Sequence, residues 1–185
     1  MFMLYAIPIG LVLGVLLGGR MGGLAALQFR WMPVILGGLL IQVALFSPAV
    51  TERVGNLGPW IYVLSTGVVL AALVANWRTT GVLVVAAGAF SNMAAIVANG
   101  GYMPASASAL AALGRHLGTE YSNSAALANP NLALFTDIFA LPRWVPAANI
   151  FSVGDVLIGV GVVVVIAAAM RRGGPVRIAR ADTAA

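Results

Sequence analysis

Residues 151–170 read FSVGDVLIGVGVVVVIAAAM, and Asp155 is the one charged side chain among them. An α-helix needs about 20 predominantly apolar residues to cross the hydrocarbon core of a membrane. In lipid, the main-chain N–H and C=O groups must pair within their own segment, so an apolar stretch of this length is expected to be helical. The sequence therefore predicts a transmembrane helix here.

Four further apolar stretches precede this one, and the breaks between them contain arginine, asparagine or glutamate. These stretches cover residues 2–19, 31–50, 59–75 and 81–98. Together, the five predict an all-α fold, an integral membrane bundle of five transmembrane helices. We expect a single transmembrane domain over residues 1–172 and a disordered cytoplasmic tail over residues 173–185.

The composition also points to a membrane protein. Of the 185 residues, 61% are hydrophobic and 8% are charged, and the mean hydropathy is +1.00. A soluble domain keeps about 25% charged residues, so this composition excludes a water-facing globule. The chain has no cysteine and a single histidine, His116, so we expect no metal and no cofactor. The net charge of +5 comes from scattered arginines, so we expect no nucleic-acid partner.

The arginines predict the orientation in the lipid bilayer. With the N-terminus outside, seven of the ten arginines lie on the cytoplasmic side and three outside. Cytoplasmic loops carry the excess of positive residues. We therefore expect a multi-pass protein of the bacterial cytoplasmic (inner) membrane, with its N-terminus outside and its C-terminus inside. The inner arginines are Arg20, Arg30, Arg78, Arg171, Arg172, Arg177 and Arg180, and the outer ones are Arg53, Arg115 and Arg143.

The first stretch carries Gly10, Gly14 and Gly18, which are spaced four apart and so share one helix face. Stripes of small residues let membrane helices approach closely. We expect this face to pack against another helix of the same chain, and homo-oligomerisation through it is the alternative. Gly37 and Gly38 suit the same packing role.

Residues 99–150 form the longest connection, and we expect them to be an ordered extracytoplasmic cap. Connections of this length without structure are uncommon, and this one keeps aliphatic and aromatic residues that disordered segments lack. Its paired glycines, Gly100 and Gly101, predict a left-handed end to the fourth helix.

Two short helices are expected within the cap. Ser106 or Ser108 caps the first, which runs to about Leu117 and stops at Gly118. The second is predicted from residues at helical spacing. These residues are Leu132, Phe135 and Ile138 or Phe139.

Ser152 and Asp155 open the fifth stretch, and two interpretations of them stay open. Their spacing is that of a capping box, and the positive end of the helix dipole stabilises a carboxylate there. Alternatively, Asp155 lies at the membrane edge to contact a ligand or a neighbouring arginine.

Four motifs resemble those of a known family. They are NGGYMP at 99–104, YSN at 121–123, DIFALP at 137–142 and FSVGD at 151–155. In them the chain is similar to an uncharacterised family of bacterial multi-pass membrane proteins, known only as a domain of unknown function. Thr136 departs from the pattern, since glycine is expected before the aspartate. The resemblance implies a membrane location and a role for the cap, and it supplies no activity or catalytic residue.

The polar side chains deep in the predicted spans are not ionisable. We expect them to form hydrogen bonds between helices. Two of them, Gln42 and Asn92, are also expected to meet below the cap and line a small pocket for a neutral ligand. The full set is Gln42, Ser65, Thr66, Ser91 and Asn92.

No catalytic centre is predicted, because the residue types for a triad are present without a nucleophile elbow. The leading hypothesis is a non-enzymatic integral membrane component whose cap binds a partner protein or a small or lipid-like ligand. The first alternative is a small transport component for a neutral or amphipathic solute. The second is a membrane enzyme that acts on a lipid at the outer leaflet through Asp137 or Asp155. The expected ligand or partner contacts are Asn99, Tyr102, Tyr121, Asn123, Asp137, Asp155, Gln42 and Asn92.

Overall fold

The computed structural model describes residues 2–114, 124–125 and 129–172. The chain is mostly helical, which confirms the all-α prediction at this level. The longer helices are α1 (Ala6–Leu16, preceded by the 3-10 turn η1, Phe2–Tyr5), α3 (Met32–Leu45), α5 (Gly58–Val74), α6 (Val82–Ala98) and α8 (Val153–Arg172). The shorter ones are α2 (Met21–Ala25), α4 (Pro48–Val54), the 3-10 turn η2 (Gly55–Leu57) and α7 (Ala107–Leu113).

Each predicted apolar stretch contains one of the longer helices, with some shifted ends. α3 ends at Leu45, before the predicted limit, because Pro48 cannot donate the hydrogen bond that would continue it. α1 ends at Leu16, and Gly18 follows with a φ of 76°. By length and composition, α8 is the one helix in the described ranges that is long and apolar enough to cross a membrane, and four shorter apolar helices accompany it.

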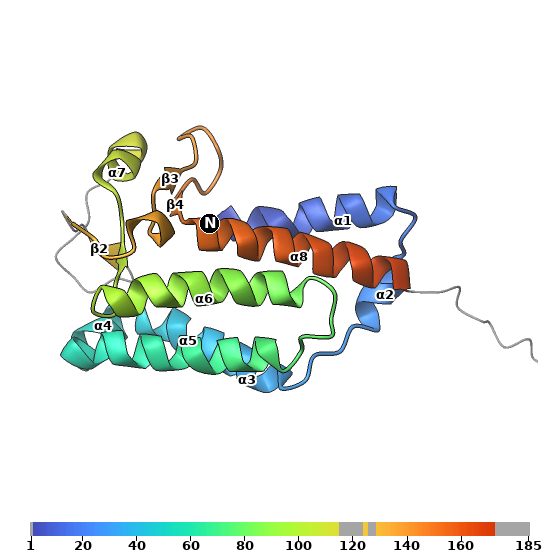
Figure 1. Ribbon diagram of the computed structural model, residues 1–185, viewed down its shortest axis with the longest axis horizontal. Helices are drawn as coiled ribbons and strands as arrows, with labels where there is room; N and C mark the ends of the chain where they lie inside the picture. The colour runs from blue at the N-terminus through green and yellow to red at the C-terminus, as the bar shows by residue number, and fades with distance from the viewer. Residues whose placement is uncertain (1, 115–123, 126–128, 173–185) are drawn as a thin grey trace, which may run out of the picture.

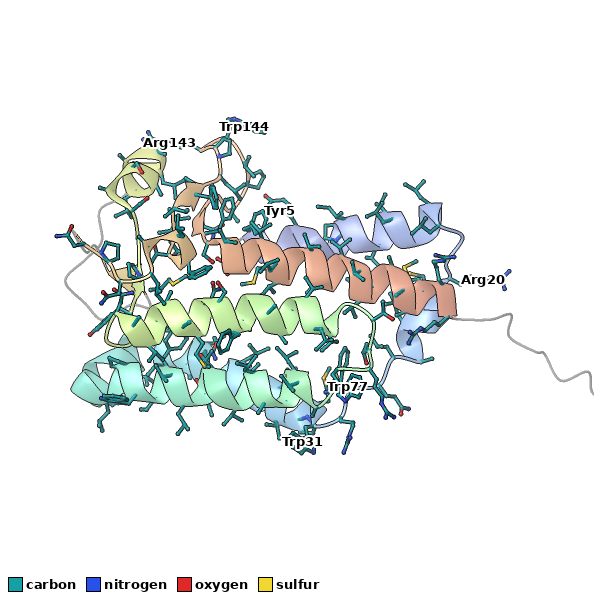
Figure 2. The ribbon with its side chains drawn as sticks, viewed as in Figure 1. Tyr5, Arg20, Trp31, Trp77, Arg143 and Trp144 are labelled. Atoms are coloured by element: carbon teal, nitrogen blue, oxygen red, sulfur yellow. The ribbon has the colours of Figure 1, made fainter. Side chains whose placement is uncertain are left out.

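The longer helices form a row, and the last of them in the sequence lies inside it. α8 packs between α1 and α6, α5 packs against α6, and α3 packs against α5. Figure 1 shows this row from α1 at the top to α5 and α3 at the bottom. The described part of the cap (residues 99–114, 124–125 and 129–150) covers one end of the row, the cap end. Arg20 and the indoles of Trp31 and Trp77 lie toward the opposite end, the far end (Figure 2).

Glycines bring α6 and α8 into main-chain contact. Gly88 lies against Gly154, and Gly81 lies against Gly161, so the two pairs recur at a spacing of seven along antiparallel helices. A Cβ atom added to Gly161 would lie 2.6 Å from the main-chain nitrogen of Val85. Interfaces of small residues that permit such an approach are typical of helices packed in membranes.

The predicted glycine stripe of the first helix packs within the chain. Gly10 and Gly14 face α8, which covers the surface that the oligomeric alternative would use. Gly18 lies beyond the helix end, and no atom comes within 4 Å of its Cβ position, so it takes no part in this contact. Gly38 packs against α5, whereas the Cβ position of Gly37 is open.

The first helix of the cap is shorter than predicted. The Ser106 hydroxyl caps α7 as predicted and accepts a hydrogen bond of 3.1 Å from its first turn. α7 ends at Leu113, however, with Gly114 at its C-cap and a φ of 61°, and the predicted end at Leu117 and Gly118 lies outside the described residues. Arg143 explains the earlier end, because its guanidinium donates to two carbonyl groups of the last turn (2.8 and 3.0 Å).

The prediction of a second helix in the cap is also wrong for most of its length. It is a single 3-10 turn, η3 (Ala133–Phe135), followed by extended chain. Phe139 stacks on Phe151 with ring centroids 5.5 Å apart, and Phe151 stacks on Phe2 at 4.3 Å, so long-range contacts outweigh the local helical spacing. Two strand pairs form here. They are the parallel pair β1 (Met103–Pro104) with β2 (Ser124–Ala125), and the antiparallel pair β3 (Phe139–Ala140) with β4 (Ile150–Phe151).

Candidate functional site

Two carboxyl groups come together at the cap end of α8. Asp155 lies in the first turn of this helix, and Asp137 belongs to the cap. The negative charge of Asp155 is close enough to affect the ionisation of Asp137. The structure therefore brings together two of the predicted site residues that come from different segments.

Asp155 is held by the predicted capping box. The Ser152 hydroxyl oxygen accepts from the main-chain N–H of Asp155 (3.0 Å), and the Asp155 carboxylate accepts from the main-chain N–H of Ser152 (3.1 Å). α6 contributes Asn92, whose amide nitrogen donates to Asp155 Oδ1 (2.8 Å) and whose oxygen accepts from the Ser152 hydroxyl (2.7 Å). Both carboxylate oxygens of Asp155 are therefore engaged.

The main chain of Asp137 is held by the end of β1 and by the residues that follow it. Its N–H donates to the Pro104 carbonyl (2.9 Å), and its own carbonyl accepts from the Ser106 N–H (3.0 Å). The preceding residue, Thr136, is 1% exposed and has a φ of −87°, which any residue can adopt. The threonine at this position thus causes no backbone strain.

The carboxyl group of Asp137 is the unusual member of the site. Asp137 is 7% exposed, and no hydrogen bond or ion pair to its carboxylate is found among the described residues. Burial, and then the charge of Asp155, raise the pKa of Asp137 from 3.8 to about 7. This carboxyl group exchanges its proton near neutral pH, and its ionised form has no counter-charge from the described part of the chain. It can accept a cation or a hydrogen-bond donor.

The other predicted contacts in the cap have different surroundings. The Asn99 amide nitrogen donates to the Asn131 carbonyl, and the Asn99 side-chain oxygen accepts from the Asn131 N–H, both at 2.9 Å. Asn99 therefore fastens the cap to the end of α6. Tyr102 is half-buried beside β1. Tyr121 and Asn123 lie outside the described residues.

The predicted meeting of Gln42 and Asn92 does not occur. Gln42 donates from α3 to the Thr66 hydroxyl on α5 (3.2 Å), whereas Asn92 binds Ser152 and Asp155 at the start of α8. α5 packs against both α3 and α6, and this order of helices directs the two amides to different neighbours. The common pocket expected from the sequence is therefore absent between these two residues.

Asn92→Ala is expected to destabilise the protein by about 2 kcal/mol, because Asp155 and Ser152 each lose a hydrogen bond to the half-buried Asn92 amide. Gln42→Ala removes a single long hydrogen bond and should cost less than about 1 kcal/mol. Thermal unfolding in detergent, followed by circular dichroism, compares the two variants. Equal losses would show that Asn92 is no more important than an ordinary interhelical amide.

Sequence reasoning missed the glycine contact that makes this site possible. A Cβ atom on Gly154 would lie 2.7 Å from both the Asn92 side-chain carbon and the Gly88 carbonyl oxygen. The signal was present as the matched spacing of Gly81 with Gly88 and of Gly154 with Gly161. In the described ranges, no three His, Cys, Asp or Glu side chains converge as a metal site would need.

The model of a family of unknown function (DUF5317) matches residues 26–167. The chain belongs to this family. The match includes α3, α5, α6, the cap and most of α8, and so both carboxylates of the site. No curated protein and no solved structure matched the chain.

Proposed function

We propose that this DUF5317 chain is a five-span protein of the bacterial cytoplasmic membrane, with its N-terminus and cap outside. Its function in this proposal is non-enzymatic: the cap binds a small ligand or a partner protein through a cationic or hydrogen-bond-donating group. The observation that carries the proposal is the buried Asp137 carboxyl group. A carboxyl group that is mostly buried and has no partner in the described chain is costly when ionised, and a ligand that supplies a donor would reduce this cost.

The outer faces of the helices support lipid as the surrounding solvent. Leu16 is 74% exposed, Val43 is 72% exposed and Leu64 is 71% exposed. Soluble monomers rarely expose contiguous apolar patches of more than a few hundred Å². Large exposed apolar side chains on α1, α3, α5 and α6 are instead compatible with a bilayer around the whole row.

The four shorter apolar helices can cross a membrane when the apolar residues next to their ends are included in the span. At about 1.5 Å per residue, the 17 residues of α6 span about 26 Å, and α3 is shorter. Apolar residues also lie just beyond the helix ends, as at Leu17 and Phe46. Short hydrophobic segments are also accommodated by local thinning of the bilayer.

Labelling of single cysteines tests the membrane placement, because the chain has no cysteine of its own. Ser108→Cys, at an exposed position of α7, should react with an impermeant maleimide added to intact cells. Thr80→Cys, at an exposed position of the far end, should react only after the cells are opened. The reverse pattern, or recovery of the protein in the soluble fraction, would contradict the placement.

Native mass spectrometry tests the binding role. Wild-type protein isolated from its own membranes in a mild detergent should carry a stoichiometric small molecule or companion chain. Asp137→Asn should lose it while its circular dichroism spectrum stays unchanged, and Gln42→Ala should keep it. Isolation of the wild-type chain alone, without bound mass, would count against the proposal.

The pKa of Asp137 also favours a second candidate, the enzyme acting on a lipid of the outer leaflet. A carboxyl group that titrates near pH 7 is suited to general acid–base catalysis. This alternative predicts turnover of a membrane lipid that Asp137→Asn abolishes. Binding without turnover would favour the non-enzymatic role.

A further inference from the structure

A cavity with both polar and apolar walls lies at the far end of the bundle. It has a volume of about 290 Å³ and lies between three segments: the chain from α2 to α3, the turn from α5 to α6, and the last turns of α8. Gln28, Thr79, Thr80 and Arg172 supply its polar groups. Leu27 and Val165 are among the apolar residues of its wall.

Arg172 is oriented across this cavity. Its guanidinium donates to the Thr80 hydroxyl oxygen at 2.7 Å. A guanidinium has five N–H donors, and this is the one hydrogen bond to the Arg172 side chain found in the described chain. Arg172 is also exposed, so its remaining donors can reach a ligand.

The charge around the cavity is of one sign. No aspartate or glutamate lines it, and within the ranges that the structure describes no carboxylate forms a salt bridge with an arginine of the far end. The described carboxylates of the site, Asp137 and Asp155, lie at the opposite end of α8. An anion in this cavity would therefore meet positive charge without competition from an acidic side chain.

The walls of the cavity are held in place. The Asn76 side chain accepts from the main-chain N–H of Arg30 (2.7 Å) and donates to its carbonyl oxygen (2.9 Å), which ties the α2–α3 connection to the end of α5. The main-chain N–H of Arg20 donates to the Met170 carbonyl (2.9 Å), which ties the start of α2 to α8. These hydrogen bonds hold the segments around the cavity together.

We propose that this cavity binds the phosphate group of an anionic phospholipid in the inner leaflet, with Arg172 as its main contact. A planar guanidinium binds phosphate oxygens with two parallel hydrogen bonds, and basic pockets between helices on the cytoplasmic side hold anionic head groups. Thr79, Thr80 and Gln28 supply further donors, and the apolar wall receives the first carbons of the acyl chains. This inference rests on the proposed membrane placement.

Thermal unfolding in nanodiscs tests the lipid site. One set of nanodiscs contains phosphatidylcholine alone. The other set contains phosphatidylcholine and phosphatidylglycerol in equal amounts. Phosphatidylglycerol should raise the unfolding temperature of the wild-type protein by several degrees. Arg172→Gln should lose most of this rise, because losing a charge-assisted contact weakens binding about tenfold. Ala168→Leu, which fills the cavity without changing charge, should lose it too.

The control is Arg78→Gln, which removes the same charge from the same end of the bundle. Arg78 lies over the Trp77 ring at 5.1 Å and does not line the cavity. If Arg78→Gln lost the stabilisation by phosphatidylglycerol to the same extent as Arg172→Gln, the effect would come from general surface charge. That result would overturn the site. Equal stabilisation by soluble glycerol 3-phosphate in phosphatidylcholine nanodiscs would overturn the assignment to a lipid. Failure of the protein to enter nanodiscs would instead contradict the proposed function.

Discussion

Gly88→Ala is expected to lower the free energy of unfolding by about 3 kcal/mol, at the upper end of the usual cost of overpacking. The added Cβ atom would lie 2.8 Å from the main-chain nitrogen of Ile158 and closer still to the Gly154 carbonyl oxygen. Neither atom belongs to a flexible side chain, so α6 and α8 must separate. This separation would also draw Asn92 away from Asp155. Thermal unfolding in detergent measures the effect.

Gly37→Ala is the matched control, because Gly37 also lies inside a helix and no atom comes within 4 Å of its Cβ position. Alanine is favoured over glycine in a helix by about 1 kcal/mol. The control variant should therefore be as stable as the wild-type protein or slightly more stable. A Gly88→Ala variant that unfolds at the wild-type temperature would show that the close contact of α6 and α8 is not required.

Asp137→Asn is expected to stabilise the protein at pH 8 and to change it little at pH 4. The folded-state pKa of Asp137 is raised from 3.8 to about 7, so the folded chain holds this proton more tightly than the unfolded chain. The wild-type protein then loses stability as the pH rises from about 4 to about 7, and the loss stays constant above that. The full difference is about 4 kcal/mol at most.

The measurement is the stability difference between Asp137→Asn and the wild-type protein across this pH range, since other groups that titrate cancel in it. An asparagine keeps the shape of the side chain and cannot ionise. Asp155→Asn serves as the contrast, because it weakens the acceptors of the capping box and should destabilise the protein at pH 8. A difference between Asp137→Asn and wild type that does not vary with pH would contradict the burial of an ionised Asp137.

The sequence predicted the helices well, because the signals for them are local. Each of the five apolar stretches contains a helix, and the Ser106 and Ser152 caps lie where hydroxyl side chains precede helical runs. The apolar run over residues 31–50 predicts too long a helix, because Pro48 interrupts the run and α3 ends at Leu45. Gly100 and Gly101 have positive φ angles of 74° and 93°, as predicted for the end of α6.

The cap and the site depended on contacts that no local pattern contains. Phe139 became part of a strand because its ring stacks on Phe151. Asp137 lies near Asp155 because the cap folds back over the start of α8, and its main chain is fixed by Pro104 and Ser106 rather than by its own neighbours. Polarity alone suggested that Gln42 would join Asn92, but polarity does not indicate which helices are adjacent.

The place of α8 within the row has a consequence for biosynthesis. α1 leaves the ribosome well before α8, yet α8 carries the surface that the Gly10–Gly14 face of α1 contacts. α3, α5 and α6 can associate during translation, whereas α1 must wait without a partner until Val153–Arg172 has been synthesised. A nascent chain that stops before this helix leaves two glycine faces uncovered and lacks half of the acidic pair. Quality-control proteases would therefore meet such fragments in an open, incompletely assembled state.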